Sequence, residues 1–206
     1  GIPVFHDDQH GTAIVLLAAL INACRVLGRD PAKLRVVISG AGAAGTAIAQ
    51  LLRGVNFADA DWEPVEDIVV CDSRGAIHAG RAGLSPEKEA LLAYTNQAAH
   101  TGSVHEVLQG ADVFIGVSKG GLLAAGDIQR MAEAPIILAM ANPEPEIMPD
   151  VALAAGAAAR SGRRRGRSRD RRVRPARGLV MRSGCTRERR RVTRNLPGSG
   201  TLDAAG

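Results

Sequence analysis

The fold of this chain is decided by the stretch Val36-Val37-Ile38-Ser39-Gly40-Ala41-Gly42-Ala43-Ala44-Gly45. It begins with consecutive β-branched residues, the pattern of a strand that is buried on both faces of a parallel sheet. A G-x-G-x-x-G motif follows, and apolar residues typical of a helix come after it. The motif is weak evidence alone, but between a strand and a helix it predicts a dinucleotide-binding loop.

Each glycine of the loop has a separate expected task. Gly40 permits the tight turn, Gly42 lets a pyrophosphate approach the backbone, and Gly45 allows close packing of helix on strand. Ala43 and Ala44 complete the loop, and the helix predicted after it, over residues 46–52, presents free N–H groups at its N-terminus that favour an anion. We therefore expect Gly40, Gly42, Ala43, Ala44 and Gly45 to bind the cofactor. The alternative is a tight strand–helix turn without a ligand.

A second strand, residues 67–72, ends in Asp72, which we expect to accept hydrogen bonds from the cofactor ribose. It lies 27 residues after Gly45, somewhat beyond the usual spacing, and a longer loop at residues 56–64 accounts for the excess. The carboxylate favours NAD because it repels a 2′-phosphate. Arg74 is placed to accept that phosphate instead, so the sequence leaves NAD and NADP both open.

The rest of the pattern alternates between strands and helices. Thr12 is the expected N-cap of a helix over residues 13–27, which is apolar all round and so predicted to be buried. Asp127 is the expected N-cap of a helix over residues 128–131. Further helices are predicted at residues 86–93 and 104–108, and strands at residues 113–117 and 136–140. The alternation predicts an α/β fold, a Rossmann-like doubly wound parallel sheet.

Charge divides the 206-residue chain into two parts. Residues 160–206 hold 16 Arg, no Lys and three acidic residues, whereas residues 1–159 hold ten basic and 18 acidic ones. We therefore predict an NAD(P)-binding domain over residues 1–159 and a basic, low-complexity, disordered tail over residues 160–206. Arginine without lysine is also what a GC-rich gene read out of frame produces. A nucleic-acid-binding tail is the alternative.

Several broad classes are disfavoured by composition. No apolar run reaches the roughly 18 residues of a membrane span, and no signal peptide opens the chain. Three cysteines without paired spacing give no disulfide framework, which fits a reducing, cytoplasmic location. The chain begins at Gly1 without an initiator Met, so we expect a fragment.

The first polar loop, Phe5-His6-Asp7-Asp8-Gln9-His10, places two adjacent carboxylates before an apolar helix. Carboxylates are the ligands that a hard divalent cation prefers. Helix capping and simple solvation explain the same residues equally well, so the pattern alone leaves both interpretations open.

Several ordered motifs resemble those of the malic enzymes, over residues 1 to about 155. They are Asp7-Asp8-Gln9-His10-Gly11-Thr12-Ala13, the Gly40–Gly45 loop, Asp72-Ser73-Arg74-Gly75, Phe114-Ile115-Gly116-Val117-Ser118 and Asn142-Pro143-Glu144-Pro145-Glu146-Ile147. The resemblance implies oxidative decarboxylation of malate to pyruvate and CO2, with NAD or NADP, Mg2+ or Mn2+, and a homo-oligomeric intact protein.

The resemblance also implies roles for particular residues. Asp8 would be a metal ligand, and Asp7 would support the catalytic centre by orienting the family's catalytic lysine. Asn142 would contact substrate and nicotinamide, and Ser118 would contact the cofactor. The family's lysine base and tyrosine acid belong to a domain before Gly1. We therefore expect no catalytic residue in this chain and no malate oxidation by the chain alone.

The remaining candidates have plain alternatives. Tyr94 is expected to be a packing residue, and Lys33 and Lys88 are expected to be solvated. Lys119 follows a strand and is placed to approach the cofactor, although the family usually has a small residue there. The alternative functions are another NAD-dependent dehydrogenase, of the amino-acid dehydrogenase type, and a nucleic-acid-binding protein.

Overall fold

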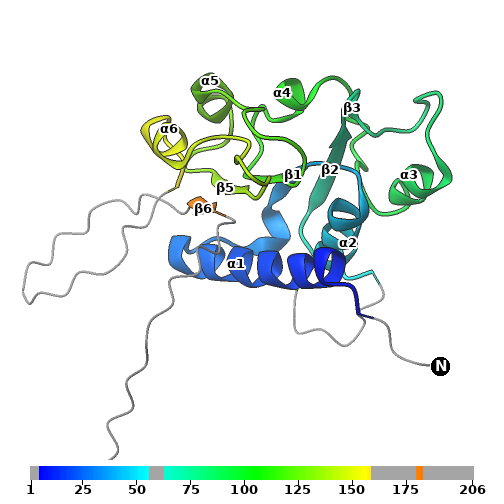
Figure 1. Ribbon diagram of the computed structural model, residues 1–206, viewed down its shortest axis with the longest axis horizontal. Helices are drawn as coiled ribbons and strands as arrows, with labels where there is room; N and C mark the ends of the chain where they lie inside the picture. The colour runs from blue at the N-terminus through cyan, green and yellow to red at the C-terminus, as the bar shows by residue number, and fades with distance from the viewer. Residues whose placement is uncertain (1–4, 56–62, 159–179, 183–206) are drawn as a thin grey trace, which may run out of the picture.

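A computed structural model describes residues 5–55, 63–158 and 180–182 of the chain (Figure 1). Its centre is one six-stranded sheet in the order β3-β2-β1-β4-β5-β6, in which β3 alone runs antiparallel to its neighbour. The strands are β1 (Arg35–Ser39), β2 (Asp67–Asp72), β3 (Gly75–Ala76), β4 (Val113–Gly116), β5 (Ile136–Ala139) and β6 (Val180–Arg182). The predicted doubly wound parallel sheet is therefore confirmed.

The helices connect these strands and cover both faces of the sheet (Figure 1). The helical segments are a π-helical turn η1 (Asp7–Gly11), α1 (Thr12–Leu27), a 3-10 turn η2 (Pro31–Lys33), α2 (Ala43–Leu52), α3 (Pro86–Leu91), α4 (Val104–Val107), α5 (Ala125–Gln129) and α6 (Pro149–Ala154). The sequence did not predict β3 or α6.

Alternate residues of β1, β2, β4 and β5 enter two separate cores, because successive side chains of a strand point to opposite faces. Val36 and Ile38 of β1 pack with α1 and α2 in the first core. Val37 of the same strand packs with Phe114 and the helices α4, α5 and α6 in the second. The continuous β-branched run of β1 is thus explained by burial on both faces.

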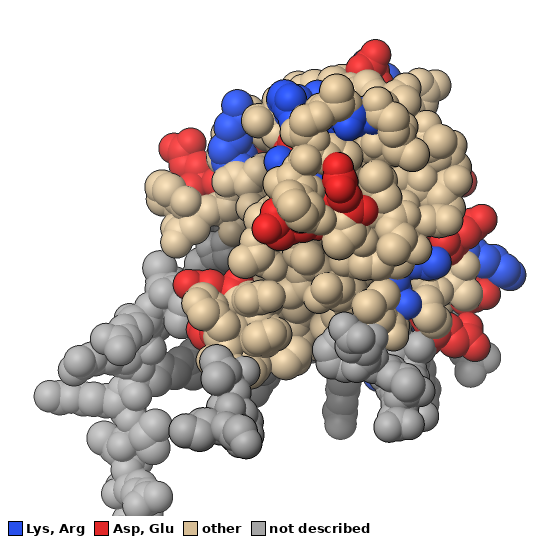
Figure 2. Space-filling model, turned by 90° about the vertical axis from the view of Figure 1, so that its right-hand side faces the viewer, with Lys and Arg blue, Asp and Glu red and all other residues tan. Residues whose placement is uncertain are grey.

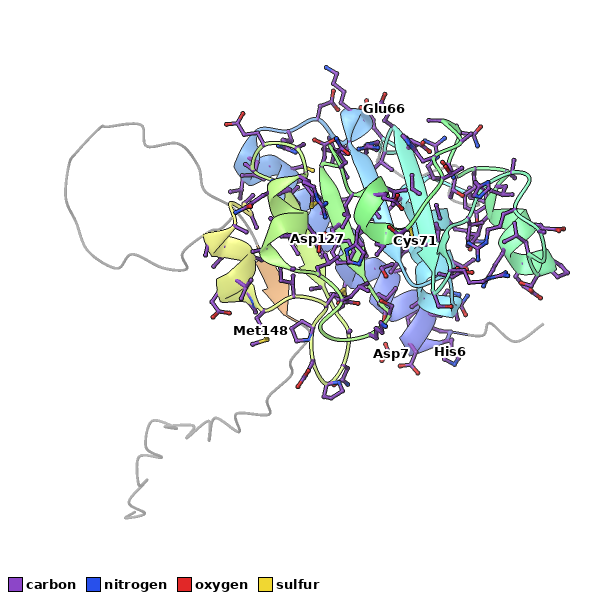
Figure 3. The ribbon with its side chains drawn as sticks, turned by 90° about the horizontal axis from the view of Figure 1, so that it is seen from above. His6, Asp7, Glu66, Cys71, Asp127 and Met148 are labelled. Atoms are coloured by element: carbon purple, nitrogen blue, oxygen red, sulfur yellow. The ribbon has the colours of Figure 1, made fainter. Side chains whose placement is uncertain are left out.

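The described cysteines serve as core residues, as predicted. Cys24 and Cys71 are free and buried, and burial raises the pKa of the Cys71 thiol to about 12. A neutral thiol behaves as a small apolar group. Cys71 lies within the sheet, whereas Met148 stands at the surface beside α6 (Figure 3).

The first long helix differs from the prediction in two ways. Thr12 is not an N-cap, because its backbone is already helical and the helix is extended upstream by η1. The helix is also not buried all round: Leu16 and Leu20 are buried, but Ile14 and Val15 are 56% and 58% exposed. Its end is as expected, at Gly28 with φ of 65°.

Three further predictions differ from the structure. Helix α2 begins at Ala43 rather than after Gly45. Asp127 lies inside α5, where its carboxylate accepts a hydrogen bond from the Ala124 N–H that precedes the helix. The segment predicted to be disordered contains the strand β6, which pairs in parallel with β5. The rest of that segment lies outside the described residues, as does most of the long loop before β2.

One helix within the described residues, the continuous 21-residue stretch Asp7–Leu27, is long and apolar enough by length and composition to cross a membrane. The expectation that no such stretch exists was therefore wrong. Its buried side packs against α2 and the sheet in the first core, so we interpret it as a core helix of this domain. Charged side chains of both signs are interspersed on the face shown in Figure 2.

Candidate functional site

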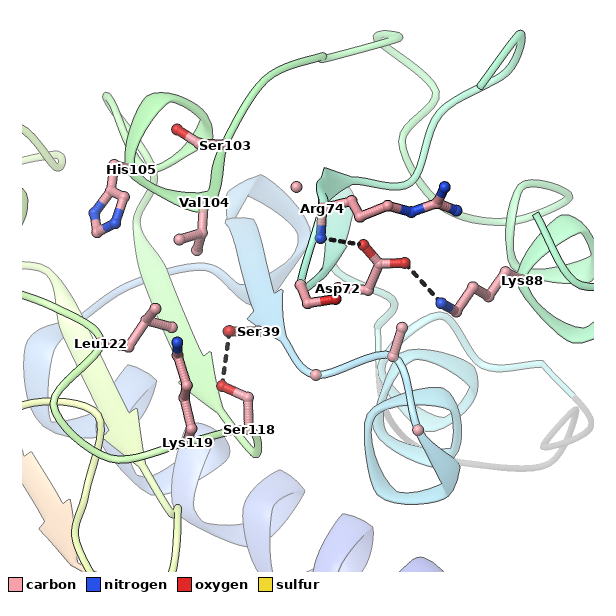
Figure 4. Close-up of a pocket in the computed structure, with 15 residues that line it drawn as sticks. Ser39, Asp72, Arg74, Lys88, Ser103, Val104, His105, Ser118, Lys119 and Leu122 are labelled. Carbon is pink, nitrogen blue, oxygen red and sulfur yellow. Dashed lines mark hydrogen bonds and ion pairs between the residues drawn. The ribbon is translucent and has the colours of Figure 1, made fainter. Parts of the chain in front are cut away.

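A pocket of about 660 Å³ opens at the carboxyl ends of β1, β2 and β4. The chain passes from β1 to β2 on one side and returns to β4 on the other, so the pocket lies at the point where the strand order reverses. Ligands of open α/β sheets bind at such a point. The lining residues are Ser39, Gly40, Ala41, Gly42, Asp72, Ser73, Arg74, Gly75, Lys88, Ser103, Val104, His105, Ser118, Lys119 and Leu122 (Figure 4).

The glycine loop has the geometry that its sequence predicts. Gly40 has φ of 121°, and a Cβ there would lie 2.7 Å from the Val117 carbonyl oxygen. A Cβ on Gly45 would lie 1.8 Å from the Gly40 carbonyl oxygen, so that position requires close packing. A Cβ on Gly42 would meet nothing within 4 Å. The space beside Gly42 is open, and it adjoins the N-terminus of α2.

Asp72 lies at the end of β2, and its carboxylate is held by four hydrogen bonds. Arg81 donates to both carboxylate oxygens at 2.6 and 2.7 Å, and Lys88 donates to Oδ2 at 2.6 Å. The Arg74 N–H donates to Oδ1 at 2.8 Å. Burial alone would raise the pKa of Asp72, but these hydrogen bonds outweigh it and lower the pKa to about 2. The carboxylate is therefore charged and already paired.

The lysine predictions have mixed outcomes. Lys33 is exposed, as expected, and its ammonium group pairs with Asp30. Lys88 was expected to be solvated, which is wrong, because it pairs with Asp72 at the pocket wall. Lys119 lines the pocket, and Figure 4 shows its side chain extending from the loop after β4. In the described part of the chain, no hydrogen bond or ion pair holds its ammonium group.

The start of α4 forms a further wall of the pocket, and none of its residues was predicted to line a site. Ser103 caps that helix, and its side chain and Glu106 form a capping box. His105 Nδ1 lies 3.1 Å from Oδ1 of the buried Asp127. Burial would raise the pKa of Asp127, but hydrogen bonds from Ala124, Arg130 and His105 lower it. The helix predicted at residues 104–108 is confirmed, and its start carries the Ser-x-x-Glu pattern of a capping box.

The other predicted site residues lie apart from the pocket lining. Asn142 is exposed and follows β5, at the same edge of the sheet as the pocket. Asp7 and Asp8 are exposed in η1, and Figure 3 shows Asp7 beside His6 at the edge of the molecule. Within the described residues, no group of three or more His, Cys, Asp or Glu side chains is placed to hold a metal ion.

Tyr94 packs against the first core, as predicted, and burial raises its pKa. Ser118 lines the pocket, and its hydroxyl lies 2.9 Å from the Ser39 hydroxyl, so the carboxyl ends of β1 and β4 are linked by side chains. The structure therefore brings Gly40, Gly42, Asp72 and Ser118 together around one space, while Asn142 lies further along the sheet edge.

Comparison with known proteins gives a consistent result. The profile described as "Malic enzyme, NAD binding domain" matches residues 9–155. The bifunctional malic/malolactic enzyme of Bacillus subtilis strain 168 is 52% identical over 157 residues, covering 76% of this chain and 36% of that protein. The NADP-dependent malic enzyme of Escherichia coli K12 is 44% identical over 151 residues, covering 73% of this chain and 19% of that protein.

The fold gives the same result. The crystal structure of the NAD-dependent malic enzyme of Thermotoga maritima is similar with a TM-score of 0.69 and 38% identity, over 76% of this chain and 40% of that one. The chain matches 36% and 19% of the length of the two curated relatives named above.

Proposed function

Because the chain belongs to the malic enzyme family, through an NAD-binding domain that occupies residues 9–155, we propose that it holds NAD or NADP for the oxidative decarboxylation of malate to pyruvate and CO2. The observation that carries this proposal is the open space beside Gly42, at the point where the strand order reverses. Relatives named as NAD- and NADP-dependent malic enzymes support it.

The residues present fit a nicotinamide dinucleotide. A side chain at position 42 would fill the space that a pyrophosphate needs, and glycine leaves it empty. The first N–H groups of α2 adjoin that space without a side-chain cap, so they are available to phosphate oxygens. When bound, the nicotinamide supplies the hydride acceptor for the carbon that carries the malate hydroxyl.

We propose that both NAD and NADP are accepted. A lone carboxylate at the end of β2 would repel a 2′-phosphate, but here Arg81 and Lys88 offset the charge of Asp72. The side chain of Arg74 lies at the same wall, where its guanidinium is hydrogen-bonded only to the Gly83 carbonyl among the described residues. Arg74 is therefore our candidate for a contact with the 2′-phosphate.

The metal remains a prediction. The described residues do not form a complete metal centre, so we assign no step to a metal ion. We propose Asp8 as one ligand of a Mg2+ or Mn2+ site, with Asp7 supporting that site and Asn142 contacting the substrate. We also propose that the 206-residue chain alone binds cofactor without oxidising malate. Steady NAD(P)H production from malate by the pure chain would contradict this last proposal.

Titration of the chain with NADH and NADPH, followed by reduced-nicotinamide fluorescence, tests the proposed function. We expect saturable binding of both cofactors. Arg74→Ala should raise the Kd of NADPH about tenfold, equivalent to about 1.4 kcal/mol, and leave the Kd of NADH unchanged. Arg25→Ala, on the exposed side of α1, is the matched control. Absence of binding to the unmodified chain would disprove the proposal.

A further inference from the structure

Glu146 is a fully buried carboxylate in the loop after β5, with an exposed fraction of 0%. Its Oε1 accepts a hydrogen bond from the Ser118 N–H at 2.9 Å, and its Oε2 accepts one from the Ala141 N–H at 3.1 Å. The Ser118 hydroxyl lies 3.5 Å from Oε1. Within the described residues, no Lys, Arg or His forms an ion pair with it.

The neighbouring strand leaves room for this carboxylate. Gly116 is the last residue of β4, and a Cβ there would lie 2.2 Å from Glu146 Cδ. The space that a side chain would occupy on β4 is thus taken by the carboxylate of a residue that follows β5. A glycine at the end of a buried strand otherwise weakens it, because it has no side chain to pack.

The bonds of Glu146 continue into the pocket. Ser118 is held by the carboxylate on one side and lies 2.9 Å from the Ser39 hydroxyl on the other. Ala141 immediately precedes Asn142. A chain of hydrogen bonds therefore runs across the carboxyl ends of β1, β4 and β5, which are neighbours in the sheet.

We propose that Glu146 is a positioning residue for the nicotinamide half of the cofactor: it holds the loops after β4 and β5, which carry Ser118 and Asn142, at a fixed separation. This inference rests on the proposed function. Burying a carboxyl side chain is costly, and among the described residues no cation pairs with it, so its presence here needs a reason. Bridging two N–H groups needs two acceptors and no donor, and only a carboxylate side chain offers that combination. A glutamine would turn an amide N–H toward one of the two donors.

The test uses the 206-residue chain and two ligands. NADH spans the whole pocket, whereas 5′-AMP occupies only the half beside β2. We expect Glu146→Gln to raise the Kd of NADH about tenfold and to leave the Kd of 5′-AMP within about twofold, both measured by calorimetry. Glu146→Asp is the second variant: it keeps a carboxyl group but withdraws its oxygens by one methylene. It should raise the Kd of NADH and spare the Kd of 5′-AMP in the same way.

Asp67→Asn is the matched control. Asp67 is also a buried carboxylate that accepts backbone N–H bonds, from Ile68 and Gln97, but it lies at the amino end of β2, away from the pocket. The control should leave both Kd values unchanged. An unchanged NADH Kd in the Glu146 variants, or an equal loss for NADH and 5′-AMP, would overturn the inference. Failure of the unmodified chain to bind NADH would instead overturn the proposed function.

Discussion

The Asp72 carboxylate links stability to pH through its two cationic partners. Its pKa falls from 3.8 to about 2 in the folded chain. The stabilisation is therefore fully present above about pH 4 and is lost as the pH falls from about 4 to about 2. We expect Asp72→Asn to lower the free energy of unfolding by about 2 kcal/mol at pH 7, with the difference shrinking below pH 4.

Urea unfolding at a series of pH values measures this effect. Glu89→Gln, on the exposed side of α3, is the control and should change the free energy of unfolding by less than about 0.5 kcal/mol. If Asp72→Asn lost stability with acid as steeply as the unmodified chain, the ion pairs of Asp72 would not be the cause.

The sequence predicted the place of Asp72 but not its partners. A carboxylate that ends a buried strand must lie at the carboxyl edge of the sheet, and strand periodicity is enough to show this. Arg81 and Lys88 reach it from a loop and a short helix, whose paths depend on turns rather than on periodicity. For the same reason Lys88 was wrongly expected to be solvated.

At the scale of elements, the glycine loop offers two positions with opposite demands. A methyl group on Gly42 meets nothing, so Gly42→Ala should keep stability within about 1 kcal/mol and raise the NADPH Kd at least tenfold. A methyl group on Gly45 meets the Gly40 carbonyl oxygen, so Gly45→Ala should destabilise the chain by about 1–3 kcal/mol or more.

Urea unfolding and NADPH titration of the same two variants separate the effects. A Gly42→Ala chain that bound NADPH normally would show that the pyrophosphate does not lie against this loop. Equal stability of the Gly45→Ala chain would show that α2 moves away from β1 without cost.

The sequence predicted most of the elements, including the short α4, β4 and β5, but it missed the two-residue β3 and the helix α6. The continuous apolar runs of β1 and β2 are rich in β-branched residues, which favours strands buried on both faces. Helix α6 has only six residues and begins in a proline-rich stretch, so it has too few turns to show a helical period. The prediction of Thr12 as an N-cap was wrong because the helix continues upstream into η1. Thr12 therefore lies inside the helix, where a capping residue has no role.

For the whole molecule, bound cofactor should stabilise both cores together, since the pocket is lined from elements on both faces of the sheet. A ligand at 100 times its Kd adds about 2.7 kcal/mol to the free energy of unfolding. For a chain of this size, that corresponds to a rise in Tm of about 5–10 °C.

Differential scanning calorimetry with NADPH measures this shift, and Gly42→Ala at the same cofactor concentration is the control.

The predicted layering of helices on both sides of the sheet follows from the alternation of strands and helices. The exposure of Ile14 and Val15 could not be predicted, because an apolar helix surface does not show which side is covered.

The carboxylate of Glu146 has a consequence for hydrogen exchange with solvent. The amide protons of Ser118 and Ala141 belong to loops, where exchange is ordinarily fast, yet both are bonded to a buried acceptor. Their exchange requires an opening that breaks these hydrogen bonds and exposes the buried side chain of Glu146, which costs free energy. Deuterium should therefore enter these two amides at the rim of the pocket more slowly than it enters the exposed loops of the chain.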